Sequence, residues 1–599
     1  MPDPDPRRTL LERRLRQAQA GVVPVPRTGR LPLSLQQEDL WFLDRLAAGR
    51  PVYNVDFVLR LHGELDVPAL ERAATALVAR HESLRTRFGS EHGVPHQVID
   101  PPAPVSLPVA DLSGLPADER ARRERELIED AVRRPYDLAA GPLVRLGLLR
   151  LEPTEHALLL SASHMVMDGW SVLTLAREIA VLYEAARRGQ PDPLPPLAVQ
   201  YADFAAWQRG PAATELLRRQ LDHWTGRLAG LPALDFPADR PRPERPTWEG
   251  RMAVHRLPDA LYDELEALAH AESTSLLAAL LAGFLAVLAR YTGQPDLAVG
   301  TAASGRTRRE LKDQVGFHVN MLVLRCQLSG ADPTFRELLA LASDAALDAL
   351  GHQDVPFGRL VNALQPDRES NRNPLFQVAL VLQLPHERVV VPGLAIEETI
   401  VWELGLNPGT SRFDLTVNAG RFGGGFQLLT EYSTELFDGD RIDRLHGHLQ
   451  TVLEHAVREP DARLSELLPL TEEDRRQLAG WRERMPVEPA PAESATAAEV
   501  EGEGPRTPTE EALAELWREV FGAAAEGVGI HESFFAIGGS SLQAVELMTR
   551  VQEAFLVELD LRDVFAESSI AQLGALIDQQ LGLEGLSDEE VLELLRAEE

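Results

Sequence analysis

The stretch Ser161–Trp170, which reads Ser-Ala-Ser-His-Met-Val-Met-Asp-Gly-Trp, separates two segments of different periodicity. Before it, the apolar run at 157–160 has the length of a buried strand. After it, residues 171–183 carry apolar side chains at the spacing of an amphipathic helix. The stretch is therefore expected to be a strand-to-helix connection, which indicates an α/β fold for this part of the chain.

Three residues of this connection are candidates for chemistry. His164 has a side chain whose unperturbed pKa lies near neutrality, so it can take a proton from an amine or an alcohol. Asp168, at the expected helix entrance with Gly169, can handle a second proton or hold the loop by pairing with a cation. A surface histidine followed by a helix N-cap aspartate would give the same residues, so the local pattern leaves both interpretations open.

The order His164-x-x-x-Asp168-Gly169 resembles the HHxxxDG motif of condensation domains in nonribosomal peptide synthetases. The looser pattern HxxxDG is shared with chloramphenicol-acetyltransferase-like enzymes. The resemblance implies that His164 is the histidine tied to catalysis. Ser163 stands where the fuller motif has its first histidine, a position that usually has a structural role.

Six further segments resemble the other motifs of condensation domains and follow one another in the family's order. They are residues 33–43, 80–88, 201–207, 315–325, 352–357 and 372–378. Seven matches in order are very hard to obtain by chance, whereas one would mean little. The resemblance also implies that Arg306 pairs with Asp168, which would depress the pKa of that carboxyl and make it a poor general base. The dipeptide His81-Glu82 and Trp170 resemble the subtype that joins two L-configured residues.

A second kind of motif lies near the end of the chain, at Phe534–Leu542, where two glycines precede Ser540 and Ser541. Apolar residues continue at helical spacing from Ser541 onward, which places a serine hydroxyl at a helix N-terminus. Unpaired backbone amides at such an end favour a phosphate. The segment resembles the GGxS site of peptidyl carrier proteins, which implies that Ser541 carries 4′-phosphopantetheine. A helix N-cap after a glycine turn is the alternative for the local pattern.

Composition limits the kind of partner. The chain has 599 residues, with 60 Lys and Arg against 92 Asp and Glu, so its formal net charge is −32. Such a charge argues against nucleic acid or an anionic membrane as the main partner. The single cysteine, Cys326, excludes an internal disulfide and indicates a reducing compartment. The N-terminus lacks the apolar core of a signal peptide, so a cytoplasmic location is expected.

Neither a membrane span nor a metal site is expected. The longest apolar run, at 276–289, is too short for a bilayer, and Ser273 and Thr274 before it favour a capped, buried helix. His318 and His352 have no acidic or cysteine neighbour at the spacing of metal ligands, so no metal is predicted.

The resemblance covers nearly the whole chain. It implies two chloramphenicol-acetyltransferase-like α/β lobes in a V-shaped condensation domain, followed by a small all-α four-helix carrier domain. Prolines that alternate with Ala, Glu and Gly mark a linker before the carrier, and no adenylation domain fits into that interval. The expected divisions are a leader at 1–29, an N-lobe at 30–215, a C-lobe at 216–475, a linker at 476–508, the carrier at 509–582 and an acidic tail, a candidate docking helix, at 583–599.

The resemblance implies amide bond formation between an acyl or peptidyl thioester on an upstream carrier protein and an amino acid thioester on Ser541. The partners implied are that upstream donor carrier, a phosphopantetheinyl transferase, a stand-alone adenylation enzyme that loads Ser541, and a downstream synthetase or release enzyme. Two alternatives stay open, namely an acyltransferase that esterifies a soluble alcohol and a non-catalytic condensation fold that presents the carrier. Ser163, which stands in place of the first histidine of the motif, motivates the non-catalytic alternative.

Overall fold

The computed structural model describes most of the chain. The described residues are 21–47, 49–243, 246–328, 330, 332–364, 372–383, 389–392, 394–400, 406, 409–422, 425–484, 503–521, 528–534, 537, 541–555, 557 and 569–581. The leader at 1–20, the linker residues 485–502 and the expected acidic tail at 583–599 lie outside them.

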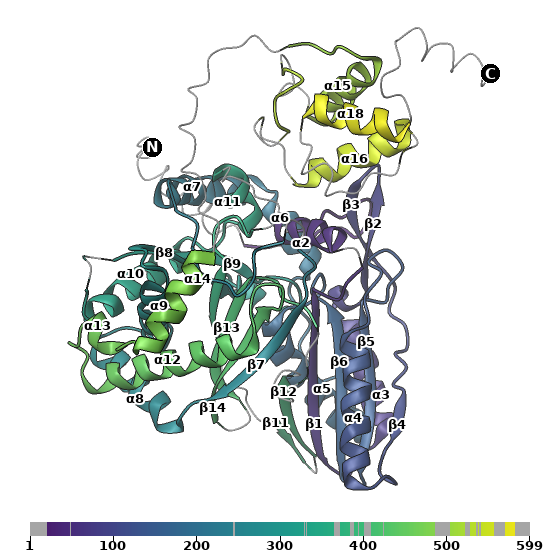
Figure 1. The fold of residues 1–599 in the computed structure, drawn as a ribbon. Coiled ribbons are helices and arrows are strands. Elements are labelled where there is room, and N and C mark those ends of the chain that lie inside the picture. Colours follow the sequence, from purple (N-terminus) through teal and green to yellow (C-terminus); the bar gives the residue numbers. More distant parts are fainter. Residues whose placement is uncertain are drawn as a thin grey trace, which may run out of the picture.

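The first lobe contains a six-stranded sheet with helices on both faces (Figure 1). Its elements are α2 (Leu35–Leu46), β1 (Asn54–Gly63), α3 (Val67–Arg80), β2 (Thr86–Glu91), β3 (Val94–Ile99), β4 (Val109–Asp111), α4 (Ala117–Val132), β5 (Val144–Glu152), β6 (Glu155–Ser163), α5 (Gly169–Arg187), β11 (Val389–Val391) and β12 (Leu394–Ile400). The strand order is β11-β12-β1-β6-β5-β4. Helices α3 and α5 pack on one face and α4 on the other. The stretch between β6 and α5 is thus the strand-to-helix connection that its periodicity predicts.

Two strands of this first sheet come from far along the chain. Strand β12 pairs antiparallel with β1, so that Phe57 lies opposite Ile400 and Gly63 lies opposite Leu394. Strand β11 pairs with β12. A division near residue 215 therefore does not separate the two lobes completely, because residues 389–400 return to the first sheet.

The second lobe repeats the plan of a six-stranded sheet covered by helices. After α6 (Tyr201–Gln208) and α7 (Pro211–Leu228), its elements are β7 (Gly250–Arg256), α8 (Asp259–Ala271), α9 (Leu276–Thr292), β8 (Asp296–Ala303), β9 (Asn320–Gln327), α10 (Phe335–Gly351), α11 (Phe357–Leu364), β10 (Val378–Leu382), β13 (Leu415–Phe422), β14 (Gly425–Ser433), α12 (Gly439–Arg458), α13 (Leu464–Leu467) and α14 (Glu472–Arg484). The strand order is β7-β14-β13-β10-β8-β9.

Helix α9 is the buried helix expected from the apolar run, and it lies among the sheet, α8, α10 and α12. Its N-cap is Ser275, whose hydroxyl accepts a hydrogen bond from the N–H of Ala278, so the caps expected at Ser273 and Thr274 are wrong. Among the described helices, none alone has both the length and the apolar composition of a membrane span. Only α8 and α9 together meet that test, and they are bent by 104° at the break between them.

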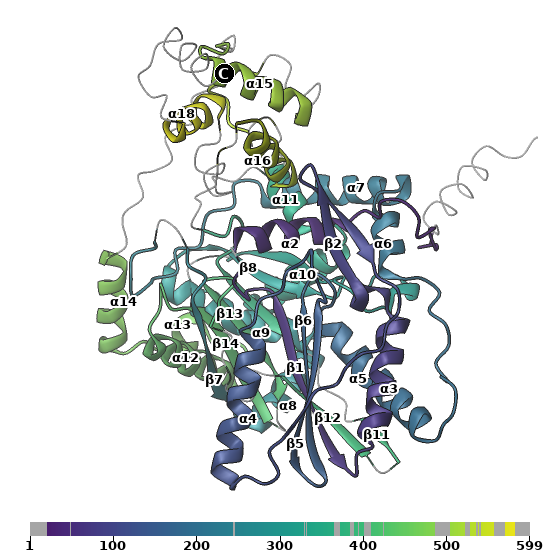
Figure 2. The same ribbon diagram turned by 90° about the vertical axis from the view of Figure 1, so that its right-hand side faces the viewer.

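The C-terminal region is helical, with α15 (Pro508–Phe521), α16 (Ser541–Phe555) and α18 (Ile570–Gln580) in its described part. Trp517 and Phe534 are fully buried between these helices, with ring centroids 5.6 Å apart. The remaining helix of the expected four would fall outside the described residues. Figures 1 and 2 both show this region above the first lobe, with α16 next to it.

Helix α16 packs on α2 and on β3 of the first lobe. Gly93, in the turn between β2 and β3, has φ of +78°, and a Cβ added to it would lie 2.7 Å from the Cα of Glu546 in α16. The two backbones are therefore in direct contact at this point. The apolar core of the first lobe also continues into that of the C-terminal helices.

Candidate active site

His164 is held by its backbone and by one ring nitrogen. Its N–H donates to the carbonyl oxygen of Tyr53 at 2.8 Å. Ring atom Nδ1 lies 2.9 Å from the carbonyl oxygen of Met167. Because a carbonyl oxygen only accepts, Nδ1 carries the hydrogen and Nε2 keeps its lone pair. Within the described residues Nε2 has no hydrogen-bond partner, so it is available to a substrate.

The environment of His164 keeps its ring neutral. The residue is largely but not fully buried, and its ring packs edge-on against Phe317, with centroids 4.9 Å apart. Burial, and then the charge of Arg412, lower the pKa of His164 to about 4, while Asp168 opposes the shift. At pH 7 the imidazole is therefore uncharged, and its free nitrogen can accept a hydrogen bond or a proton.

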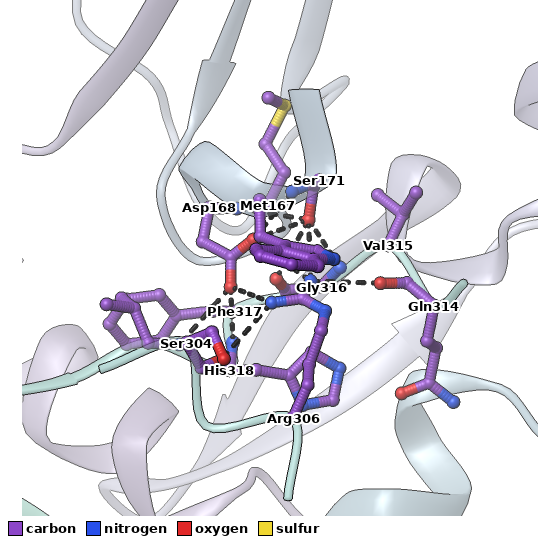
Figure 3. A network of polar contacts seen from close by, with 12 residues as sticks. Met167, Asp168, Ser171, Ser304, Arg306, Gln314, Val315, Gly316, Phe317 and His318 are labelled. Atoms are coloured by element: carbon purple, nitrogen blue, oxygen red, sulfur yellow. Dashed lines mark hydrogen bonds and ion pairs between the residues drawn. The ribbon is translucent and has the colours of Figure 1, made fainter. Parts of the chain in front are cut away.

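Asp168 forms the N-cap of α5 and is 1% exposed. One carboxylate oxygen accepts from the N–H and the hydroxyl of Ser171, at 2.9 and 2.7 Å. The other accepts from the N–H groups of His318 and Val319, at 3.0 and 3.2 Å. Since these amides belong to the second lobe, the carboxylate joins the two lobes at the beginning of α5 (Figure 3).

Arg306 completes this arrangement with a bidentate ion pair. Its two terminal nitrogens donate to the two Asp168 oxygens at 2.8 and 3.0 Å, and they also donate to the carbonyls of Ser304 and Gln314. Burial by itself would raise the pKa of Asp168, but the charge and hydrogen bonds of Arg306 hold it well below its usual value. Asp168 is thus a fixed anion with both oxygens occupied, and it is unsuited to accept a proton at neutral pH.

Ser163 and Gly169 differ in what surrounds them. Ser163 is buried, and its hydroxyl accepts a hydrogen bond from the N–H of Met165 at 3.3 Å, so it supports the turn. Gly169 is exposed, and a Cβ added to it would meet nothing within 4 Å. The fold therefore gives Ser163 a structural contact, whereas it leaves open space in front of Gly169.

Two family models match the chain. The model described as Condensation domain covers residues 27–479, and the one described as Phosphopantetheine attachment site covers residues 511–577. The chain belongs to the condensation-domain family. Its condensation domain is followed by a carrier domain, and this pair of domains is of the nonribosomal peptide synthetase type.

Curated relatives of the condensation domain are much longer synthetases. Chondramide synthase cmdD from Chondromyces crocatus is 39% identical over 468 residues, which make up 78% of this chain and 12% of that protein. Phosphinothricin tripeptide synthetase PhsC from Streptomyces viridochromogenes is 38% identical over 478 residues, or 79% of this chain and 44% of that protein. The chain therefore spans less than half the length of either relative.

Solved structures share the fold of the condensation domain. The X-domain from teicoplanin biosynthesis matches with a TM-score of 0.66 at 28% identity, over 75% of this chain and all of that one. The first condensation domain of the calcium-dependent antibiotic synthetase matches with a TM-score of 0.63 at 23% identity, over 74% of this chain and all of that one. These matches confirm the predicted α/β fold with two chloramphenicol-acetyltransferase-like lobes.

Carrier domains of the matched type hold a covalently attached 4′-phosphopantetheine. Ser541, the residue predicted to carry it, is the first residue of α16. The first amides of a helix have no partner within it, and the helix dipole favours an anion at that end. The start of α16 therefore fits a phosphate diester on Ser541.

Three contributors to the condensation-domain site were not predicted. Ser171 binds the carboxylate of Asp168, and the capping-box spacing of these two residues would have identified it. The carbonyl of Tyr53 and the charge of Arg412 come from distant segments, to which no local spacing points. Arg412 reaches this region because its Nε donates to the carbonyl of Val52 at 3.2 Å.

The expectation that His352 lacks an acidic neighbour is wrong. Asp348 precedes it by four residues, which is about one helical turn. The two side chains therefore meet at the end of α10, with Oδ1 of Asp348 and Nδ1 of His352 3.3 Å apart. His223 of α7 joins them. The same kind of helical spacing that locates apolar faces would have revealed the pair.

Proposed function

We propose that this chain forms an amide bond between an acyl or peptidyl thioester on an upstream carrier protein and an amino acid held as a thioester on Ser541. The observation that best supports this proposal is the free Nε2 of a neutral His164. The loop that holds it is anchored by the buried pair of Asp168 and Arg306. Nonribosomal condensation domains, the family matched here, are acyltransferases that form peptide bonds.

In the proposed reaction the neutral acceptor amine attacks the donor carbonyl carbon. A C–N bond forms, the C–S bond of the donor thioester breaks, and the thiol of the upstream carrier leaves. Nε2 of His164 accepts a hydrogen bond from the amine, takes the proton that the nitrogen loses after attack, and returns it to the leaving sulfur. Because the pKa of His164 is lowered to about 4, its ring is a weak base at neutral pH and contributes mainly by positioning the amine, and holding both substrates together supplies most of the acceleration.

The carrier is proposed to serve its own condensation domain. Bound 4′-phosphopantetheine supplies the thiol on which the acceptor is held. The packing of α16 on α2 and β3 supports delivery of the acceptor from this side. Residues 480–510, between the two matched models, leave no room for an adenylation domain. We therefore infer loading by a stand-alone adenylation enzyme, modification by a phosphopantetheinyl transferase, and product transfer to a downstream synthetase or release enzyme.

Two other functions have specific support. SgcC5 from Streptomyces globisporus, with a TM-score of 0.62 at 27% identity, was solved with a naphthyl ethanediol, which supports an alcohol as acceptor. The teicoplanin X-domain was solved in a complex with OxyB, which supports a scaffold that binds another protein. The free Nε2 of His164 favours an enzyme over a scaffold, and it serves an alcohol as well as an amine.

The carrier is tested first, by intact mass spectrometry after incubation with coenzyme A and a broad-specificity phosphopantetheinyl transferase. We expect one 4′-phosphopantetheine adduct that Ser541→Ala abolishes. Without an adduct on folded protein, the covalent acceptor is removed from the scheme. The free-acceptor acyltransferase or the scaffold would then be favoured.

The role of His164 is tested with His164→Ala on the loaded protein. We expect this variant to lose amide formation, because no other described group offers a free nitrogen at this loop, and to keep normal modification of Ser541. The matched control is His270→Ala, which changes an exposed histidine of α8. Full turnover by His164→Ala would contradict the assigned role, and parallel trials with amine and alcohol acceptors distinguish the two enzymes.

A further inference from the structure

A cluster of two histidines and one aspartate lies in the second lobe, outside the site described above. His223 comes from α7, Asp348 from the last turn of α10, and His352 directly follows that helix. One nitrogen or carboxylate oxygen from each lies within 4.8 Å of the other two. Their side chains are 29–32% exposed, while Nε2 of His223 is itself buried, so an ion reaches this nitrogen only after the ring turns.

The hydrogen bonds of the cluster leave nitrogen lone pairs free. Nδ1 of His352 donates to the backbone carbonyl of Asp348 at 2.8 Å and lies 3.3 Å from Oδ1 of the same residue, so the free lone pair of this ring is on Nε2, the nitrogen farther from the carboxylate. Nε2 of His223 is 3.0 Å from Oδ1 of Asp348, yet its direction makes no hydrogen bond with any described atom. The two imidazoles stack with centroids 3.6 Å apart and planes 5° apart. Because the lone pair of an imidazole lies in its ring plane, one ring must rotate out of the stack before both can bind the same ion.

The elements that carry these side chains are fixed to each other. Nε1 of Trp224, next to His223, donates to the backbone carbonyl of His352 at 2.9 Å. Gln220, one turn earlier on α7, exchanges two hydrogen bonds with Asp354, at 2.8 and 3.0 Å. The backbone positions are therefore set before any ion binds, and only side-chain rotation remains.

We propose that His223, Asp348 and His352 bind a divalent transition-metal ion of the Zn²⁺ type. Two imidazoles and one carboxylate are a ligand set of zinc sites that keep a fourth position for water. Zinc bonds of about 2.1 Å place the ligand atoms roughly 3.4 Å apart in a tetrahedron, so the side chains must rotate to bring their ligand atoms into this arrangement. Arg227 lies 3.5 Å from Oδ2 of Asp348, which leaves Oδ1 for the ion.

Such an ion would strengthen the junction between the lobes. The turn after His352 leads into α11, where the N–H of Gly358 donates to the carboxylate of Asp39 in α2 at 3.0 Å. Helix α2 is also the helix on which α16 of the carrier packs. The metal would tie α7 to the segment that supports this surface.

The proposal is tested by isothermal titration of ZnCl₂ into chelator-treated, tag-free full-length protein. We expect one site of high affinity, weakened by more than about tenfold in Asp348→Asn and in His223→Gln, since loss of even an outer hydrogen-bond partner costs 10–100-fold at metal sites. MgCl₂ should give no binding, because Mg²⁺ prefers oxygen ligands. Asp344→Asn on the exposed side of α10 and His270→Gln on α8 are matched controls that should bind as the wild type does.

A second readout is the visible absorption of bound Co²⁺, which is strong only when the ion is held in a four-coordinate protein site. It should be present in the wild type and the controls and lost in Asp348→Asn, with unchanged thermal unfolding of the metal-free proteins as the check on folding. Absence of a saturable site in the wild type would overturn the proposal. Equal binding by the cluster variants and the wild type would do the same, because it assigns the ion to other surface groups.

Discussion

At Gly169 the structure leaves space that a methyl group would fill. A Cβ there meets no atom within 4 Å, and the residue opens α5 next to the loop of His164. Alanine is a better helix former than glycine. We therefore expect Gly169→Ala to leave the unfolding temperature unchanged or slightly raised, while amide formation falls on the order of tenfold to a hundredfold because the methyl displaces the substrate.

The control for this prediction is Gly447→Ala. Gly447 is an exposed glycine of α12 whose added Cβ also meets nothing within 4 Å. It should raise the unfolding temperature slightly, for the same reason, and leave the rate of amide formation unchanged. Normal turnover by Gly169→Ala, measured with loaded donor and acceptor, would show that the space in front of α5 is not used by the substrate.

The imidazole of His318 is buried and makes no hydrogen bond within the described structure. The residue is 0% exposed. Tyr201 and Phe204 flank the ring, with centroids 4.8 and 4.7 Å away. Burial holds the pKa of His318 well below its usual value, so the ring is neutral. We expect His318→Phe to stabilise the protein by about 1 kcal/mol, since it removes an unpaired polar group.

Thermal denaturation checks this prediction, with His446→Phe as the comparison. His446 is equally buried, but its Nε2 is hydrogen-bonded to the hydroxyl of Thr430 at 2.7 Å. We therefore expect His446→Phe to lower the melting temperature and His318→Phe to raise it. A decrease at both positions would mean that His318 has a partner such as an ordered water.

At the level of elements, the start of α5 and the connection between β8 and β9 are joined by one carboxylate. Because the pKa of Asp168 is lowered in the folded protein, its contribution to stability is complete above its unfolded pKa near 3.9 and is lost as the pH falls through the lower folded value. Asp168→Asn should lower the melting temperature at pH 7 by leaving Arg306 buried without its counterion.

Melting curves of the wild type and Asp168→Asn at decreasing pH test this assignment. The difference between them should be constant from pH 7 to about 5 and should shrink below about 4, as the carboxylate of the unfolded wild-type chain begins to take up its proton. Asp438→Asn is the control, because Asp438 is the exposed N-cap of α12. A difference that does not change with pH would contradict the ionic role of Asp168.

Local spacing predicted the strand and the helix around the site, but it did not predict the contacts that these elements make with distant segments. The apolar run before Ser161 and the helical pattern after Trp170 predicted β6 and α5, because each element has its own periodicity. The pair of Asp168 and Arg306 could be expected only from the resemblance, since 138 residues separate them. Arg412 has no local signal, and its effect on the pKa of His164 arises only from folding.

On the scale of the whole molecule, the carrier contacts the condensation domain through Gly93. Gly93→Ala should displace α16, because its Cβ would lie 2.7 Å from a backbone atom of Glu546. We expect slower amide formation with the acceptor on Ser541 and an unchanged rate with a small free aminoacyl thioester. Equal rates for both acceptors would exclude this contact from acceptor delivery.

Gly29→Ala is the matched control for the contact. Gly29 has φ of +77°, close to the +78° of Gly93, but its added Cβ meets nothing within 4 Å. Both variants therefore carry the same backbone strain, and only Gly93→Ala creates the collision. A similar loss of activity in both would assign the effect to strain in the first lobe.

The order of the motifs predicted the two lobes and the helical carrier, and the family models and solved structures confirm them. The packing of α16 on the first lobe could not be predicted, because it depends on surfaces that no periodicity marks. The return of residues 389–400 to the first sheet was also missed, since the edge of β1 gives no signal in the sequence. The exact domain boundaries remain a prediction.

The return of residues 389–400 to the first sheet limits which chimeras of such chains can fold. A chimera with its breakpoint between the lobes would lay β12 of one parent along β1 of another, and all seven cross-strand pairs from Phe57–Ile400 to Gly63–Leu394 would be new. Without its partner, β1 would present an unpaired edge prone to aggregation. A chimera that is to fold should therefore take both lobes of the condensation domain from the same parent.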